Sequence, residues 1–299
     1  MRILSLSVIV MALTVIGGSF QAAVQSPPPS SPYVKAHLDP NLPQKARPIP
    51  AHDTVFLEEM TWLEVRDALK DGNDTVIIAT GGIEQNGPYL ALGKHNYILR
   101  ATTERVARKL GNALVAPIVP FVPEGDIEPV SGHMRFPGSI TVRQETFVAL
   151  LTDIAESMRV HRFKHVILLG DSMGNQEGMK TVAETLSRKW VGSGTSFHYI
   201  PEYYDNPLWT KWLKEHGIHE VPEGYHDDFR HSSIMLFVDP NTVRMKERMA
   251  VEKFSINSIP LAPIEKTRKI AEQLIDYQAD VTIAAIRKAL ASTSKAKEQ

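Results

Sequence analysis

The feature that most constrains this chain is a strand, a long polar loop and a helix that follow one another. Residues 75–79 are β-branched and apolar, which is typical of a strand buried in a parallel sheet. Residues 97–110 repeat apolar side chains at helical spacing and end at Gly111, which favours a helix with a glycine C-cap. The loop between them, residues 80–96, is longer than most such connections. Because open α/β sheets bind ligands in loops at the carboxyl ends of their strands, we expect the functional site here.

This loop carries a recognisable motif. Residues 80–96 read TGGIEQNGPYLALGKHN. They resemble the signature of the creatininase family of metal-dependent amidohydrolases, Glu-x-His-Gly-Pro-His-Leu-Pro-Leu-x-x-Asp, whose Glu, first His and final Asp bind metal. Glu84 matches the family's glutamate, Asn86 stands at its histidine and His95 at its aspartate. The resemblance implies a site that keeps the family's framework and changes two of its three ligands in this loop.

Short apolar segments alternate with amphipathic ones along the rest of the chain. Further strands are expected at residues 113–119, 165–169 and 197–200, and helices at 61–70, 143–161, 177–190 and 264–290. Strands that alternate with helices indicate a parallel sheet with both faces covered. The expected fold is therefore α/β, a three-layer α/β/α arrangement with a mostly parallel central sheet, similar to creatininase. No internal repeat is seen, so residues 53–299 are expected to form a single domain.

The N-terminal region has the composition of an export signal. Residues 1–23 contain Arg2, an apolar run and then small residues, as secretory signal peptides do. The alternative, an uncleaved membrane anchor, is disfavoured by the short apolar run. Residues 24–52 are rich in proline and serine and are expected to be an extended linker. These features predict a periplasmic or secreted protein with no stable membrane association after signal cleavage.

Composition excludes several classes of function. The chain has no cysteine, so disulfides, thiolate catalysis and thiolate metal sites are absent. Its formal net charge of -1 gives no electrostatic reason to expect a nucleic-acid partner.

A second polar loop spans residues 129–139. It resembles the family's Ser-x-x-His-x-x-Phe-Pro-Gly-Thr, which lines the substrate pocket, with a Ser-to-His spacing one residue shorter. The resemblance implies that Ser131 and His133 bind substrate. The alternative is a turn shaped by proline and glycine with incidental polar residues.

A third loop, residues 169–176, directly follows an expected strand. Family members have Asn-Gly-His-Gly-Gly-Asn there, and the His binds metal. A gapless match places Ser172 on that His, whereas one inserted residue places Asp171 on it. Because a carboxylate is a better ligand for a divalent ion than an alcohol, Asp171 is the predicted ligand, and Ser172 and Asn175 are predicted to bind substrate. Alternatively, Asp171 caps the following helix.

The fourth loop, residues 225–233, resembles the family's His-Ala-Gly-Glu-x-Glu-Thr-Ser. The resemblance implies that His226 contacts substrate and transfers a proton. Asp228 is predicted to assist it, since a carboxylate that accepts an imidazole N–H fixes the tautomer and raises basicity. The alternative is that Asp227 or Asp228 only caps the next helix.

Together these loops predict a site for one divalent ion. In the family the aspartate at the position of His95 bridges two metal ions, and a neutral imidazole is not expected to bridge. Glu84, His95 and Asp171 would therefore hold a single ion, most simply zinc, with iron or manganese as alternatives. That ion would lower the pKa of a bound water and polarise the scissile carbonyl.

The predicted function is a secreted, metal-dependent amidohydrolase that cleaves a non-peptide C–N bond in a cyclic or small amide. Two alternatives stay open: a non-catalytic binding protein on the same fold, and a metallopeptidase that trims peptides. The resemblance implies a homo-oligomer, a hexamer in the family. The aromatic segment at residues 203–212 is expected to cover the pocket or to pack at a subunit interface.

Overall fold

The computed structural model describes residues 41–204 and 206–297. Residues 46–299 form one compact unit. The predicted signal peptide, residues 1–23, and residues 24–40 of the predicted linker lie outside the described residues, so export and the proposed domain limits stay predictions. Among the helices that are described, none is both long enough and apolar enough to cross a bilayer.

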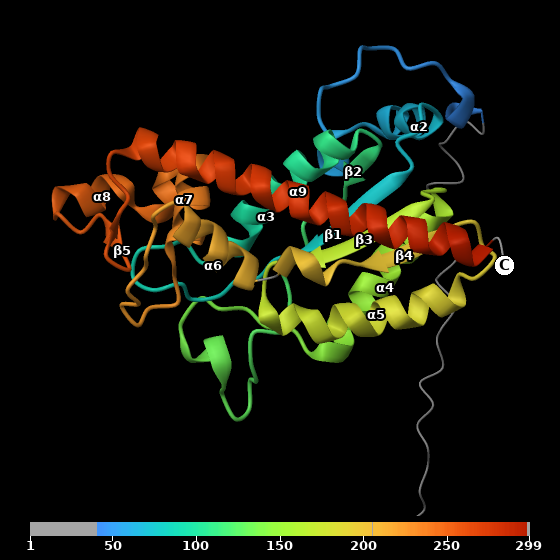
Figure 1. Ribbon diagram of the computed structural model, residues 1–299. Helices are drawn as coiled ribbons and strands as arrows, with labels where there is room; N and C mark the ends of the chain where they lie inside the picture. Colours follow the sequence, from blue (N-terminus) through green and yellow to red (C-terminus); the bar gives the residue numbers. More distant parts are fainter. Residues whose placement is uncertain (1–40, 205, 298–299) are drawn as a thin grey trace, which may run out of the picture. The chain divides into compact units, whose positions relative to one another are not determined.

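The centre of the unit is a four-stranded parallel sheet (Figure 1). Its strands are β1 Thr75–Thr80, β2 Ala113–Val115, β3 His165–Gly170 and β4 Ser196–Tyr199, in the order β2-β1-β3-β4. β2 is shorter than predicted because Pro117, which cannot donate to a ladder, follows it after one residue.

Helices cover both faces of the sheet, as predicted (Figure 1). On one face, alternate strand residues such as Val76 and Leu168 pack with α4 Gln144–Val160 and α5 Gln176–Lys189. On the other, Ile77 and Leu169 pack with α3 Lys94–Leu110 and α9 Ile264–Lys297. The strands are buried on both sides, which explains why they read as continuous apolar runs. The three-layer α/β/α prediction is confirmed.

The remaining elements frame this core. α2 Trp62–Lys70 begins at Thr61 with the capping box that its sequence predicted. α7 Phe229–Val238 packs beside the first half of α9 in a separate apolar cluster, to which α6 Asn206–Glu215 also contributes. The other short elements of the described unit are α8 Met245–Ala250, the hairpin β5 Ser255–Ile256 with β6 Ile259–Pro260, and 3-10 turns at Leu57–Glu59, Gly132–Arg135, Met173–Asn175, Pro201–Tyr204 and Pro240–Val243.

The strand order determines where a ligand can bind. From β1 the chain returns through α3 to β2 on one side, whereas β3 lies on the other side of β1. A crevice therefore opens beyond the paired carboxyl ends of β1 and β3, where Thr80 lies opposite Gly170. The predicted functional loops after residues 80 and 170 both start at this crevice.

Candidate active site

Three residues predicted as metal ligands lie together at the crevice. His95, in the first turn of α3, lies between two carboxylates. Its Nδ1 is 2.9 Å from Oδ2 of Asp171, and its Nε2 is 2.8 Å from Oε1 of Glu84. Because both ring nitrogens face carboxylate oxygens, the imidazole links the loop after β1 to the end of β3.

Two buried cations accompany these carboxylates. Nζ of Lys94 lies 3.3 Å from Oε1 of Glu84, and Nη2 of Arg230 lies 3.1 Å from Oδ1 of Asp171. Burial alone would raise the pKa of Asp171, but the Arg230 charge and the hydrogen bond from His95 lower it to about 2. Burial and Lys94 lower the pKa of His95, but hydrogen bonds to the carboxylates of Asp171 and Glu84 outweigh them and raise it. In the inner part of the site, the buried carboxylates are thus neutralised by the buried cations beside them.

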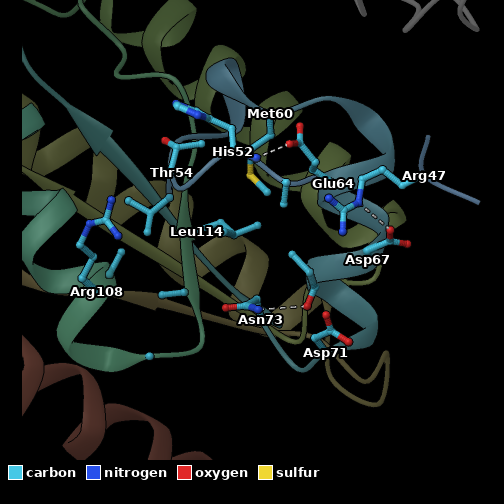
Figure 2. Close-up of a pocket in the computed structure, with 16 residues that line it drawn as sticks. Arg47, His52, Thr54, Met60, Glu64, Asp67, Asp71, Asn73, Arg108 and Leu114 are labelled. Carbon is cyan, nitrogen blue, oxygen red and sulfur yellow. Dashed lines mark hydrogen bonds and ion pairs between the residues drawn. The ribbon is translucent and has the colours of Figure 1, made fainter. Parts of the chain in front are cut away.

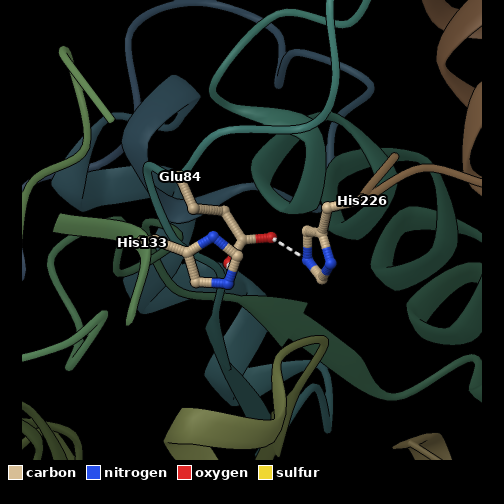
Figure 3. Close-up of side chains that lie close together, drawn as sticks. All are labelled: Glu84, His133 and His226. Atoms are coloured by element: carbon tan, nitrogen blue, oxygen red, sulfur yellow. Dashed lines mark hydrogen bonds and ion pairs between the residues drawn. The ribbon is translucent and has the colours of Figure 1, made fainter. Parts of the chain in front are cut away.

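Two further imidazoles reach Glu84 from the solvent side (Figure 3). Nε2 of His226 lies 3.0 Å from Oε1 of Glu84, and Nε2 of His133 lies 3.3 Å from Oε2. The rings are 4.6 Å apart between centroids. Burial alone would raise the pKa of Glu84, but hydrogen bonds from His226 and His95 hold it well below its usual range. Glu84 is therefore an ionised carboxylate that faces several nitrogen donors.

The predicted partnership of Asp228 with His226 is not what the structure shows. Asp228 caps α7: its carboxylate accepts hydrogen bonds from the backbone N–H of His231 and from Nδ1 of that ring, both at 2.7 Å. The carboxylate thus orients His231 instead, whose Nε2 lies 3.8 Å from Asp171. Helix capping, the alternative weighed from the sequence, is the role that the geometry gives Asp228.

The residues predicted to bind substrate differ in their placement. Ser172 lines the cavity beside Glu84, as does His133. The Ser131 hydroxyl donates to Asp126 at 2.7 Å within its own turn. Asn175 is buried, and its amide donates to backbone oxygens of Thr80 and Gly81, so it ties the two loops together.

Asn86 also has a structural role. It is fully buried, and its amide donates to the backbone oxygens of Glu84, Ala91 and Leu92 at 2.9–3.4 Å. These bonds hold the loop in the shape that presents the Glu84 carboxylate.

A cavity of about 280 Å³ is lined by eight of the residues described above, namely Glu84, Lys94, His95, His133, Asp171, Ser172, His226 and His231. A neighbouring cavity of about 290 Å³, lined in part by α6, shares Lys94, Tyr204, His226 and His231 with it. A third, of about 400 Å³, lies between the segment from Arg47 to Val55 and α2 (Figure 2). That third cavity is lined by Asn73 and by Ala113, which lie at the amino ends of β1 and β2, so it is at the wrong edge of the sheet for an α/β active site.

Comparisons with known proteins show the family of this chain. The family profile described as creatinine amidohydrolase, creatininase, matches residues 58–291. The chain belongs to the creatininase family. It is 25% identical over 236 residues to the 3-dehydro-scyllo-inosose hydrolase of Thermotoga maritima, which covers 76% of this chain and 69% of that protein. It is 23% identical over 202 residues to the creatinine amidohydrolase of Pseudomonas putida, which covers 64% of this chain and 74% of that one.

Solved creatininases have the same fold. A crystal structure of creatinine amidohydrolase superposes with a TM-score of 0.54 at 19% identity, covering 81% of this chain and 98% of that chain. Other solved forms are a Zn-Zn type of a creatininase mutant and a manganese creatininase. The family thus includes proteins that hold divalent metals, which raises the question of whether the residues of this chain do the same.

In this creatininase-family chain, potential ligand atoms gather in two groups. Among the described residues, Glu84, His133 and His226 form one group, and His95, Asp171 and His231 form the other, with atoms within 4.8 Å of one another in each. The predicted set of Glu84, His95 and Asp171 is divided between them because His95 separates the two carboxylates. A set of three ligands made of imidazole nitrogens and a carboxylate oxygen suits zinc, iron or manganese, so the chemistry of these residues fits a divalent ion.

Four residues of the site were not predicted: Lys94, Glu124, Arg230 and His231. Lys94 stands directly before His95 at the start of a helix, a position that could have indicated it. Glu124 is buried against Gly82, where a Cβ would lie 2.2 Å from its Oε1, so this approach requires glycine. Arg230 gives no sequence signal, because its pairing partner lies 59 residues away.

Glu124 makes the stability of the metal-free protein depend on pH. Burial, and then the neighbouring Glu84 charge, raise the pKa of this carboxyl from 4.5 to about 9. Its contribution to stability is fully present below the unfolded pKa, near 4.5, and is lost as pH rises through about 9. We expect the free energy of unfolding of Glu124→Gln to fall less with rising pH than that of the wild type. Urea unfolding at pH 5, 7 and 9 in EDTA would measure it, and equal pH slopes for wild type and variant would contradict it.

Proposed function

We propose that this protein hydrolyses a C–N bond in a small amide, cyclic or short, with the help of one divalent ion. The observation that supports the proposal best is the position of Glu84: a carboxylate flanked by Nε2 of His133 and of His226, in the lining of a cavity sized for a small molecule. The same edge of the sheet, at the carboxyl ends of the strands, is where open α/β folds bind their ligands.

Two residues of the cavity, Lys94 and Glu124, have direct tasks in such a reaction. When bound, a divalent ion supplies polarisation of the carbonyl and a more acidic water. The ammonium of Lys94 lies inside the cavity and would stabilise negative charge that develops on the carbonyl oxygen. Glu124 lines the same cavity, with an Oε1 that has no hydrogen-bond partner among the described residues, and would hold the proton destined for the leaving nitrogen.

The cavity also bears on the kind of substrate. About 280 Å³, next to a second space of similar volume, accommodates a single ring with a substituent and not a folded peptide segment. The names of the two relatives likewise refer to small molecules, creatinine and an inosose. A small-molecule substrate is therefore favoured over peptide trimming. Zinc is the first candidate ion, with manganese and iron next.

The test is a turnover screen with the purified full-length chain loaded with zinc or manganese. Lactams, hydantoins, cyclic imides, dihydropyrimidines and short linear amides would be followed by liquid chromatography and mass spectrometry. We expect ring opening or amide cleavage of at least one class, at a rate proportional to enzyme concentration. Tight binding of such compounds without turnover would overturn the proposal in favour of a binding protein. Cleavage of peptides alone would favour a peptidase.

A further inference from the structure

We propose that the divalent ion binds only to Glu84, His133 and His226, and that the inner group of His95, Asp171 and His231 is a permanent ion-pair network in place of a second metal. This rests on the proposed function only for the presence of an ion. The assignment itself comes from the contacts of the two groups. Below, the three residues shown in Figure 3 are called the outer group.

The inner group is already served by a cation of the protein. Nη2 of Arg230 lies 3.1 Å from Oδ1 of Asp171, and Nη1 lies 3.2 Å from Nε2 of His231. The guanidinium, a group that stays charged in proteins, thus contacts two of the three potential ligands. The three ligand residues and the arginine are all buried or nearly so, where repulsion between a guanidinium and a divalent ion is poorly screened.

The inner ligands are also committed to other partners. Oδ2 of Asp171 accepts from Nδ1 of His95 at 2.9 Å, and Nδ1 of His231 donates to Asp228 at 2.7 Å. Nη2 of Arg230 is held in addition by Oε1 of Gln278 on α9, at 3.3 Å, and its guanidinium lies over the ring of Trp209 at 4.8 Å. A metal here would have to displace an arginine that is fixed from three sides.

The outer group differs from the inner group in its exposure to solvent and in having ring nitrogens with fewer other partners. The side chain of His226 is 46% exposed and that of His133 is 25% exposed, so an ion can reach both from solvent. Both rings present Nε2 to the same carboxylate, which gives the two-histidine, one-glutamate set of catalytic zinc sites with open positions toward the cavity. Nδ1 of His133 is buried without a hydrogen-bond partner among the described residues, so nothing there competes for that ring.

Two residues oppose the outer site, and one of them is His95, whose Nε2 lies 2.8 Å from Oε1 of Glu84. The other is Lys94. Lys94 lies 3.3 Å from Oε1 of Glu84 and donates to the backbone oxygen of His226 at 3.5 Å. Oε2 of Glu84 faces Nε2 of His133 at 3.3 Å instead. Lys94 is therefore expected to weaken the ion without excluding it. His226 is, in this arrangement, a ligand and not the proton carrier that the sequence predicted.

The experiment is calorimetric titration of the metal-stripped full-length protein with zinc, in wild type and variants. We expect one zinc per chain. Loss of a residue that only hydrogen-bonds to a metal ligand typically weakens metal binding by roughly 10- to 100-fold. His133→Ala and His226→Ala each remove a ligand itself and should weaken zinc binding by more than this. Lys94→Met should tighten binding by roughly tenfold, since a like charge is removed. His231→Asn, and the exposed His161→Ala as a matched control, should change the affinity less than threefold.

Cobalt substitution gives a second readout that does not depend on activity. The visible absorption of a bound Co²⁺ should vanish in His133→Ala and persist in His231→Asn. Two zinc ions per chain, no zinc at all, or loss of binding in His231→Asn with retention in His133→Ala would each overturn the assignment. Zinc bound as proposed in a protein that hydrolyses nothing would leave the assignment standing and refute only the proposed function.

Discussion

Replacing Glu84 by glutamine should lower kcat/KM by at least roughly 10²–10³-fold, as much as removing one oxyanion-hole donor lowers kcat in other hydrolases. The change keeps the size of the side chain but removes the negative charge that faces Lys94, His95 and His226 at 2.8–3.3 Å. The change also replaces one carboxylate oxygen with an amide NH₂ group, which cannot accept hydrogen bonds from the surrounding nitrogen donors.

The measurement is steady-state kinetics on the best substrate of the turnover screen, with zinc-loaded protein. Glu145→Gln is the matched control, because Glu145 pairs with Arg143 on the surface and is 74% exposed. That control should be indistinguishable from wild type. If Glu84→Gln kept activity within threefold of wild type, the catalytic centre would have to lie elsewhere.

The second large effect concerns stability. Arg230→Met should reduce the free energy of unfolding by about 3–5 kcal/mol, the usual cost of leaving one member of a buried pair without its partner. Asp171 is fully buried and Arg230 nearly so, so water cannot replace the lost guanidinium. Urea denaturation of the metal-free protein would measure the change.

A matched control and a rescue make this result interpretable. Lys109→Met removes a cation from half-exposed pairs with Asp276 and Asp280, and should cost no more than about 1 kcal/mol. Adding Asp171→Asn to Arg230→Met should recover part of the loss, because the unpaired charge is then gone. If Arg230→Met lowered the free energy of unfolding by less than about 1 kcal/mol, the inner group would not depend on Arg230 as its buried cation, and the account would be contradicted.

Much of the fold could be predicted because its signals are local. The apolar runs of β1 and β3 and the capping box at Thr61 each depend on a few neighbouring residues. The convergence of Glu84 and Asp171 also followed, since two adjacent parallel strands present their carboxyl ends at the same edge. His95 could be predicted as a site residue because it belongs to the same loop motif as Glu84. The helix α3, however, begins three residues earlier than its apolar spacing predicted.

The division of the site into two groups could not be predicted in the same way. It depends on where Arg230 and Lys94 point, and those directions are set by packing against α9 and by the loop after β1. Capping of α7 by Asp228 was one of the alternatives from the sequence, but sequence spacing does not reveal that its carboxylate orients His231 instead of His226. His133 and His226 were recognised as functional residues, yet their common approach to Glu84 joins loops 93 residues apart in the chain.

The most direct test of the central claim is a crystal structure of the zinc-loaded protein with anomalous data collected at the zinc edge. The account predicts one anomalous peak per chain, about 2.0–2.1 Å from Nε2 of His133 and of His226 and in contact with a carboxylate oxygen of Glu84. Arg230 should remain beside Asp171. A peak between His95, Asp171 and His231, alone or as a second peak, would contradict it.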